Sequence, residues 1–272
     1  MKSFLTKSFL WVYILSILVP VGWVVMSSLK TGADIFGNPW APSAVPQFKN
    51  YAEAWSEAQI GTYFWNSVLV SGVTLAVLLP ISAMAAYVFA KVPFPGRRAV
   101  YTVVLGGMMF PNFLVIVPLF LLMRDLHMLD TLWGLIVIFV AFSLSFSIFV
   151  LTGFFESVPD ELAEAGVLDG ASEAGIFWRI MLPIVRPGLL VVGILNLIGL
   201  WNEYSLSLVL IQSPENRTLP IGLANLTMVQ HYQSNWGALF AAVTMTMLPM
   251  VAVYLLFRRR LESAMLAGAL KG

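Results

Sequence analysis

The sequence contains no cysteine, only two histidines and few charged residues. The absence of cysteine among its 272 residues excludes disulfide bonds, thiol catalysis and thiolate metal sites. Two histidines are too few for a histidine-rich metal site. Charged residues make up 11% of the chain, against roughly 25% in a typical soluble domain. The net charge of +1 carries no basic excess, so nucleic acid is not an expected partner.

Apolar residues dominate instead. They make up 59% of the chain, and the mean hydropathy is +0.86. Six stretches between charged residues are long enough for a transmembrane helix of about 20 residues, and none alternates like the strand of a membrane barrel. We therefore predict an all-α membrane protein, a single transmembrane domain over 1–272. The six predicted spans are 9–29, 64–90, 100–123, 132–152, 187–211 and 237–257.

The distribution of basic residues predicts the orientation. If the N-terminus is cytoplasmic, eleven of the 15 Lys and Arg residues fall in inner segments and four in outer segments. Because inner loops carry the excess of positive charge, both termini are expected in the cytoplasm. The first span is expected to remain as a helix. Its apolar run is too long for a signal peptide, and no small-residue cleavage site follows before Lys30.

The largest inner loop, 153–186, has the pattern of a helix–turn–helix. Pro159 suits a first helical turn, where a missing N–H costs little. Asp169-Gly170 is a turn signal, and Ser172 can cap a second helix. Pro183 is expected to end that helix.

Two interpretations of this hairpin were open. It can rest on lipid headgroups, as interfacial helices do. However, its first helix carries Asp160, Glu161 and Glu164, and an anionic inner leaflet repels an acidic helix. The charge pattern therefore favours a protein partner.

The hairpin also resembles a known motif. Glu164-Ala165, then Gly170, then Ile180-x-Leu182-Pro183 is similar to the EAA motif of permease subunits in binding-protein-dependent ABC importers, with both spacings kept. Gly166 stands where that family usually has a second Ala, which should weaken the helix by about 1 kcal/mol. Tight packing is therefore not expected at this position.

Further segments resemble the six-helix second permease of the maltose-type carbohydrate subgroup. They extend over most of the chain in a common order. They are Asn50-Tyr51, Asn66-Ser67, Ala85-Ala86-Tyr87 with Gly96-Arg97, Pro118-Leu119-Phe120, Asp130-Thr131 with Gly134-Leu135-Ile136, Trp201-Asn202-Glu203, Thr218-Leu219-Pro220 with Gly222-Leu223, Trp236-Gly237, and Ala267-Gly268-Ala269-Leu270-Lys271-Gly272.

This resemblance implies a type I ABC importer permease fold in a bacterial or archaeal plasma membrane. The implied partners are a second homologous permease, an ATPase dimer, an extracytoplasmic solute-binding protein, a sugar substrate and membrane lipid. The hairpin would be the coupling helix that docks on the ATPase. The implied coupling residues are Glu161, Glu164, Ala165, Asp169, Gly170, Ala171, Ile180, Leu182 and Pro183.

The chain lacks nucleotide-binding machinery of its own. It contains no Gly-x-x-x-x-Gly-Lys sequence, and no Gly-Lys dipeptide at all. We expect no catalytic residues, cofactor or metal in this chain. ATP and Mg would be bound by the partner ATPase, so the chain would be a non-catalytic subunit.

Glu203 is the one acidic residue within a predicted span. A lone intramembrane carboxylate is a functional candidate, but a structural group bonded to a neighbouring helix is an equally weighted alternative. An intramembrane enzyme is disfavoured because no nucleophile–base pair or metal cluster is evident. A secondary, ion-coupled transporter of a small polar solute remains the alternative function. The candidate substrate pathway is Trp201, Asn202, Glu203 and Tyr204, and the candidate binding-protein contacts are Glu215, Asn216, Arg217, His231 and Tyr232.

Overall fold

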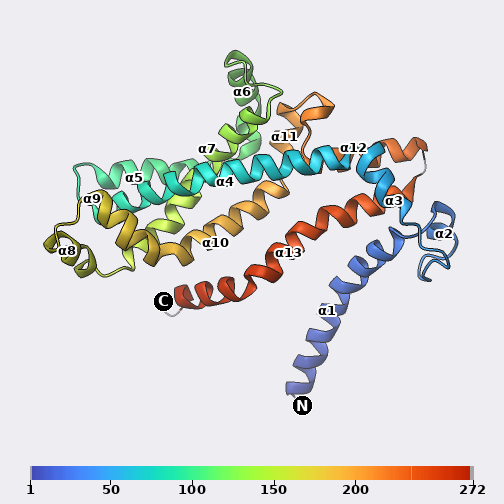
Figure 1. The fold of residues 1–272 in the computed structure, drawn as a ribbon, viewed down its shortest axis with the longest axis horizontal. Helices are drawn as coiled ribbons and strands as arrows, with labels where there is room; N and C mark the ends of the chain where they lie inside the picture. Colours follow the sequence, from blue (N-terminus) through green and yellow to red (C-terminus); the bar gives the residue numbers. More distant parts are fainter. Residues whose placement is uncertain (1, 234, 270–272) are drawn as a thin grey trace. The chain divides into compact units, whose positions relative to one another are not determined.

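The computed structural model describes residues 2–233 and 235–269, with side-chain surroundings for 6–111, 113–228 and 235–258. Every regular element within these ranges is a helix, which confirms the predicted all-α class (Figure 1). The chain divides into two compact units, each described by itself. They are Met1–Trp65 with Thr218–Ala252, and Asn66–Arg217 with Val253–Gly272.

The first unit is held together just beyond its first helix. Lys30 is 1% exposed, and its Nζ donates to the carbonyls of Asn38 and Pro39, each at 3.0 Å. The Asn50 amide donates to the carbonyls of Ser28 and Lys30 at 2.8 and 2.9 Å. These bonds satisfy buried polar groups and fold the segment after the helix back on itself. The elements are α1 (Lys2–Ser27), α2 (Gly32–Gly37), α3 (Lys49–Ala52), η1 (Glu53–Glu57), α12 (Leu219–Gln233), and the first parts of α4 (Ile60–Lys91) and α13 (Trp236–Ala269).

The second unit is built around two long helices that pack side by side, α7 (Leu132–Glu156) and α10 (Leu182–Trp201) (Figure 1). A buried polar link joins them, because the Asn196 amide donates to Ser147 Oγ at 3.0 Å. The other elements are α5 (Arg97–Gly106), η2 (Gly107–Met109), α6 (Asn112–Asp125), α8 (Glu161–Leu168), α9 (Glu173–Gly175), η3 (Ile176–Met181), α11 (Ser205–Leu210) and η4 (Pro214–Asn216).

Five helices in the described residues are long and apolar enough to cross a membrane. A sixth is present if the bent pair Arg97–Met109 and Phe113–Asp125 is counted as one span. The total therefore agrees with six spans. The five unbroken ones are Thr6–Ser27, Ile60–Lys91, Leu132–Glu156, Glu173–Trp201 and Trp236–Arg258.

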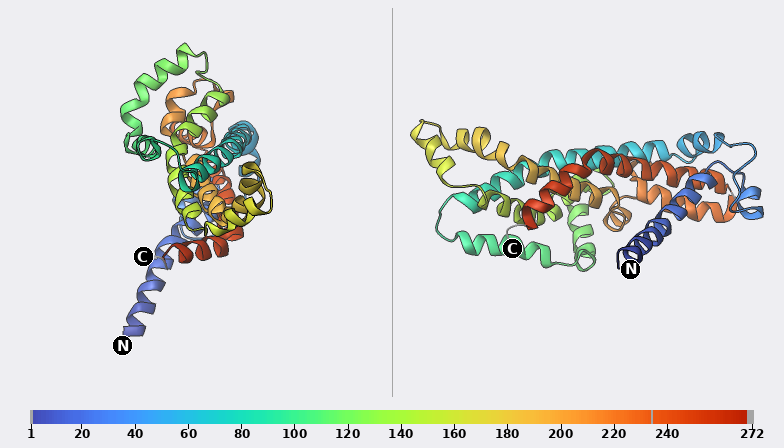
Figure 2. Two further views of the ribbon diagram at one scale, coloured as in Figure 1. Left: turned by 90° about the vertical axis from the view of Figure 1, so that its left-hand side faces the viewer. Right: turned by 90° about the horizontal axis from the view of Figure 1, so that it is seen from below.

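The third predicted span, 100–123, is not a continuous helix. Its two halves meet at 101°, the corner visible between α5 and α6 in Figure 2. Gly106 and Gly107 lie at the break, followed by Pro111 at the N-cap of α6. Glycine weakens a helix and proline removes a backbone donor, which accounts for the corner.

The fifth predicted span, 187–211, also differs. The helix begins at Glu173, so Pro183 does not end it. Pro183 instead lies in the first turn of α10, where η3 runs directly into α10 and a missing N–H costs little. At the other end the helix stops at Trp201, and α11 starts separately at Ser205.

Candidate functional site

The segment between α7 and α10 folds as a helical hairpin, as the sequence predicted. Its first arm is α8, and its second arm is α9 followed by η3. Gly170 makes the turn with φ +79°, a backbone conformation that residues with a Cβ rarely adopt. Ser172 begins the second arm, and its Oγ accepts the amide of Gly175 at 3.2 Å, which confirms the predicted cap.

Gly166 of α8 packs against the second arm of the hairpin. A Cβ at this position would meet Ile180 Cδ1 at 2.7 Å and Ile176 Cγ1 at 3.3 Å. Gly166 itself is buried. The expectation of loose packing here was therefore wrong: the missing Cβ weakens α8 as an isolated helix but lets the arms pack closely.

The second arm continues into the membrane helix without a loop. From Glu173 to Trp201 the chain is one helical element, with the π-helical stretch η3 between α9 and α10. The hairpin also packs on the ends of α4 and α7 through an aromatic cluster. Tyr87 lies 5.7 Å from Phe155 and 5.2 Å from Phe177 between ring centroids. The second arm is therefore continuous with α10 and packed against α4 and α7.

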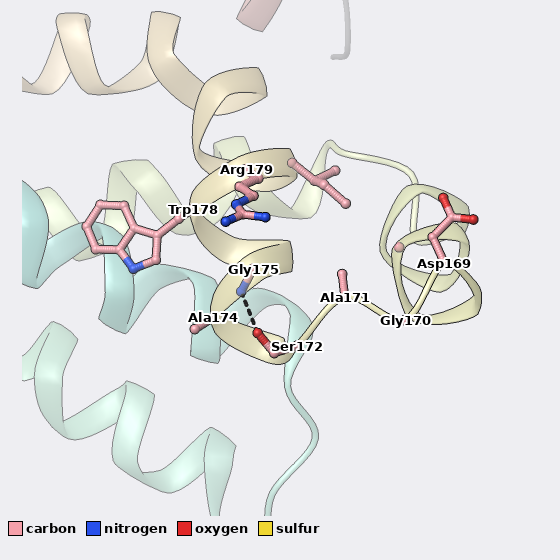
Figure 3. Close-up of a pocket in the computed structure, with 10 residues that line it drawn as sticks. Asp169, Gly170, Ala171, Ser172, Ala174, Gly175, Trp178 and Arg179 are labelled. Atoms are coloured by element: carbon pink, nitrogen blue, oxygen red, sulfur yellow. Dashed lines mark hydrogen bonds between the residues drawn. The ribbon is translucent and has the colours of Figure 1, made fainter.

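Between the two arms is a pocket of about 750 Å³ (Figure 3). The Asp169 carboxylate lies on one side of it, and Trp178 and Arg179 lie on the other. On the outer side of α8, Leu168 is 88% exposed. Leu168 therefore lies in contact with solvent, next to the exposed carboxylate of Asp169.

The structure brings most of the predicted coupling residues together on this hairpin. Five are exposed on α8 or at the turn, three are half-buried between the arms or at the start of α10, and Pro183 is exposed. The exposed five are Glu161, Glu164, Ala165, Asp169 and Gly170, and the half-buried three are Ala171, Ile180 and Leu182.

Glu203 caps the short helix that follows α10. Its carboxylate accepts the amides of Leu206 and Ser207 at 2.7 and 3.0 Å, and the Ser207 hydroxyl at 2.8 Å. Both carboxylate oxygens are thus bonded to the start of α11. This geometry favours the structural alternative for Glu203.

The other predicted pathway residues surround this break in the helix. Trp201 is 4% exposed, and the Asn202 amide bonds back to the Ile198 carbonyl at 2.8 Å. Tyr204 is half-buried. The four residues are therefore neighbours at the junction of α10 and α11.

The loop 211–217 is anchored by Asp130, a residue that sequence reasoning did not select for this site. The Asp130 carboxylate accepts the amides of Gln212 and Ser213, each at 2.9 Å, and the Ser213 hydroxyl. The Asn216 amide donates to the Asp130 carbonyl at 2.7 Å. Burial raises the pKa of the Asp130 carboxyl, but the hydrogen bonds lower it more, so that the pKa lies below its ordinary value.

Asn66 holds the same loop from α4. Its amide donates to the carbonyls of Glu215 and Arg217 at 2.7 and 2.9 Å. The only sequence signal for Asn66 and Asp130 was their place in the family resemblance. The side chains of His231 and Tyr232 lie outside the described residues.

Three comparisons extend these observations to known proteins. Residues 78–267 match the family described as "Binding-protein-dependent transport system inner membrane component". Over 255 residues the chain is 42% identical to the diacetylchitobiose uptake system permease protein NgcG of Streptomyces coelicolor, covering 94% of this chain and 84% of that protein. It is 31% identical over 255 residues to the trehalose transport system permease protein SugB of Mycobacterium tuberculosis, covering 94% and 93%.

A solved structure has the same fold. It is a bacterial ABC transporter involved in the import of the acidic polysaccharide alginate, and one of its chains matches with a TM-score of 0.83. The match covers 94% of this chain and 95% of that chain at 23% sequence identity. At this identity the likeness concerns the fold alone.

Proposed function

Because the chain belongs to the family of binding-protein-dependent transport system inner membrane components, we propose that it is a permease subunit of an ATP-driven sugar importer. It forms half of the translocation pathway and works by alternating access. The ion-coupled alternative has no support from this family. The chain is a non-catalytic subunit, and a separate ATPase binds and hydrolyses ATP with Mg.

The α8–η3 hairpin is the observation that carries the ATPase assignment. It lies next to the membrane helices, exposes carboxylates and Leu168 to water, and continues into α10 as one helix. An ATPase that moves the hairpin would therefore act on α10 through the second arm, which continues into α10 without a loop. Glu164, exposed on α8, is the proposed charged contact to the ATPase.

The proposed substrate is a neutral, hydroxyl-rich solute, a sugar or oligosaccharide. Two relatives support this class, since one belongs to a diacetylchitobiose uptake system and the other to a trehalose transport system. The low charge of the spans agrees with it, since Glu203 is the one acidic residue of the predicted spans and its carboxylate is bonded to α11. Trp201, Asn202 and Tyr204 at the α10–α11 junction are the proposed lining of the pathway, whereas Glu203 holds the junction together.

The remaining proposed partners are a second homologous permease, an ATPase dimer and an extracytoplasmic solute-binding protein. We place both termini in the cytoplasm, which puts the hairpin on the ATPase side. The loop 211–217 then faces the solute-binding protein. Asp130 and Asn66 hold this loop in one conformation, which suits a docking surface.

Co-purification tests this proposal. The tagged chain is extracted from its native membrane in mild detergent, and its partners are identified by mass spectrometry. The expected result is a P-loop ATPase and a homologous permease in stable association. A chain that purifies alone from fresh membranes, and that supports uptake without ATP after reconstitution, would contradict the proposal.

A further inference from the structure

Lys91, the last residue of α4, is bound to the start of the hairpin. Its side chain is 9% exposed. Its Nζ donates to the carbonyl of Val158 at 2.6 Å and to Asp160 Oδ1 at 2.5 Å. Val158 is itself buried, at 5% exposed. A largely buried cation therefore joins α4 to the short segment between α7 and α8.

Asp160 serves this link rather than its own helix. It occupies the N-cap position of α8, where aspartate normally accepts amide hydrogen bonds from the first turn. No such side-chain bond is present in α8, whereas Ser172 makes one in the second arm. The carboxylate bonds Lys91 instead. The local capping interaction is replaced by one to a residue 69 positions away.

The ion pair lies next to the aromatic cluster that also involves α4. Tyr87, one turn before Lys91, packs against Phe155 of α7 and Phe177 of η3. Next to this apolar contact, Lys91 supplies hydrogen bonds, which have a preferred direction. The Asp160 side chain is 75% exposed, so the ion pair by itself contributes little to stability. Its effect is to set the geometry of α4 against the hairpin.

We propose that Lys91 is a positioning residue that makes α4 move together with the hairpin when the ATPase acts. This inference rests on the proposed function. α10 follows the second arm of the hairpin, because α9, η3 and α10 form one continuous helix, but α4 has no covalent connection there. Besides the apolar contact of Tyr87 with Phe177, Lys91 supplies a polar connection, because it binds both Val158 and Asp160. Arg97, at the start of α5, donates to the Ala90 carbonyl at 3.4 Å rather than to Asp160.

The test uses the complete importer reconstituted in vesicles, with solute imported per ATP hydrolysed as the readout. Lys91→Met keeps most of the apolar stem but removes the ammonium, and is expected to lower this ratio roughly tenfold. Asp160→Asn should lower it less, because Val158 still accepts from Lys91. The double variant should be no worse than Lys91→Met alone. Arg98→Met, which removes an exposed positive charge seven positions further along the chain, is the matched control and should keep the wild-type ratio.

The outcomes separate this inference from the proposed function. If the wild-type complex shows no ATP-dependent uptake, the proposed function fails. If it does, and Lys91→Met and Asp160→Asn both keep the wild-type ratio, the positioning role of Lys91 is refuted. A purely structural role would reduce the amount of assembled complex while leaving the ratio unchanged. Asp160→Asn alters an exposed side chain, so it remains informative if Lys91→Met fails to assemble.

A cross-link tests whether the connection persists through the transport cycle. Because the chain has no cysteine, the pair Lys91→Cys and Asp160→Cys can be joined selectively by a short bifunctional thiol reagent. The unlinked pair should show the reduced ratio, and cross-linking should restore it towards the wild-type value. A cross-link that abolishes uptake instead would mean that α4 and the hairpin must separate, which would overturn the proposal.

Discussion

The packing at Gly166 leads to a prediction that depends on single atoms. The perturbation is Gly166→Ala combined with Ile180→Val. A Cβ at 166 would meet Ile180 Cδ1 at 2.7 Å, and valine lacks that atom. The two substitutions should therefore compensate each other.

The magnitudes follow from the two opposing terms. Gly166→Ala gains about 1 kcal/mol of helix propensity but must displace Ile180, which costs roughly 1–3 kcal/mol of overpacking. Ile180→Val alone lowers the free energy of unfolding by about 0.5–1.5 kcal/mol. In the double variant the new methyl group occupies the vacated space. We therefore expect a favourable interaction free energy of about 1–2 kcal/mol between the two sites.

Hydrogen exchange of the α8 amides, measured by mass spectrometry on the purified complex, gives the local opening free energy. A change of about 1 kcal/mol alters protection roughly fivefold. Gly153→Ala in α7 is the matched control, because a Cβ there meets nothing within 4 Å. Gly153→Ala should stabilise α7 through its higher helix propensity. Its free-energy effect should add to that of Ile180→Val without an interaction term. Strict additivity of Gly166→Ala and Ile180→Val would refute the close packing of the two arms.

Three further predictions concern the exposed carboxylate of the hairpin, the cap of α11 and the anchored loop. Glu164→Lys reverses a charge that faces the proposed ATPase, and should abolish ATP-driven uptake while membrane insertion stays normal; wild-type uptake by this variant would refute the coupling role. Glu203→Gln removes the charge that caps α11, and should lower the stability of that helix by about 1–2 kcal/mol in a thermal unfolding assay while solute preference is unchanged. A changed preference between two sugars would show that the carboxylate contacts substrate. The pKa of Asp130 is lowered, so its stabilisation of the loop 211–217 is fully present above the ordinary aspartate value of about 3.9 and is lost as the pH falls through the lower folded value. Asp130→Asn should therefore speed amide exchange at Gln212 and Ser213 near neutral pH, and unchanged exchange would contradict the anchoring role.

The break after α10 shows why the predicted span boundaries differ from the structure. Glu203 is the one charged residue of 187–211 and most of the others are apolar, so composition predicts one helix. The chain can leave the helix at Asn202 because the Glu203 carboxylate satisfies the first amides of α11. Composition does not show that a side-chain carboxylate replaces the backbone carbonyls that would otherwise accept these amides. The corner between α5 and α6 has a clearer signal, since Gly106, Gly107 and Pro111 were visible as weak helix formers.

The all-helical membrane class, the hairpin between α7 and α10, and its turn and cap at Gly170 and Ser172 could be predicted from the amino-acid sequence. These features depend on local properties, namely apolar length, turn chemistry and capping preference. The contacts between distant groups could not be predicted in this way: Gly166 with Ile180, Lys91 with Asp160, and Asp130 with Ser213. Each of these pairs depends on how helices separated along the chain pack together, and neither residue type nor spacing encodes that directly. The physical reason is that a side chain takes its partner from the packed neighbours that surround it, whereas helix formation and membrane length are set residue by residue along the chain.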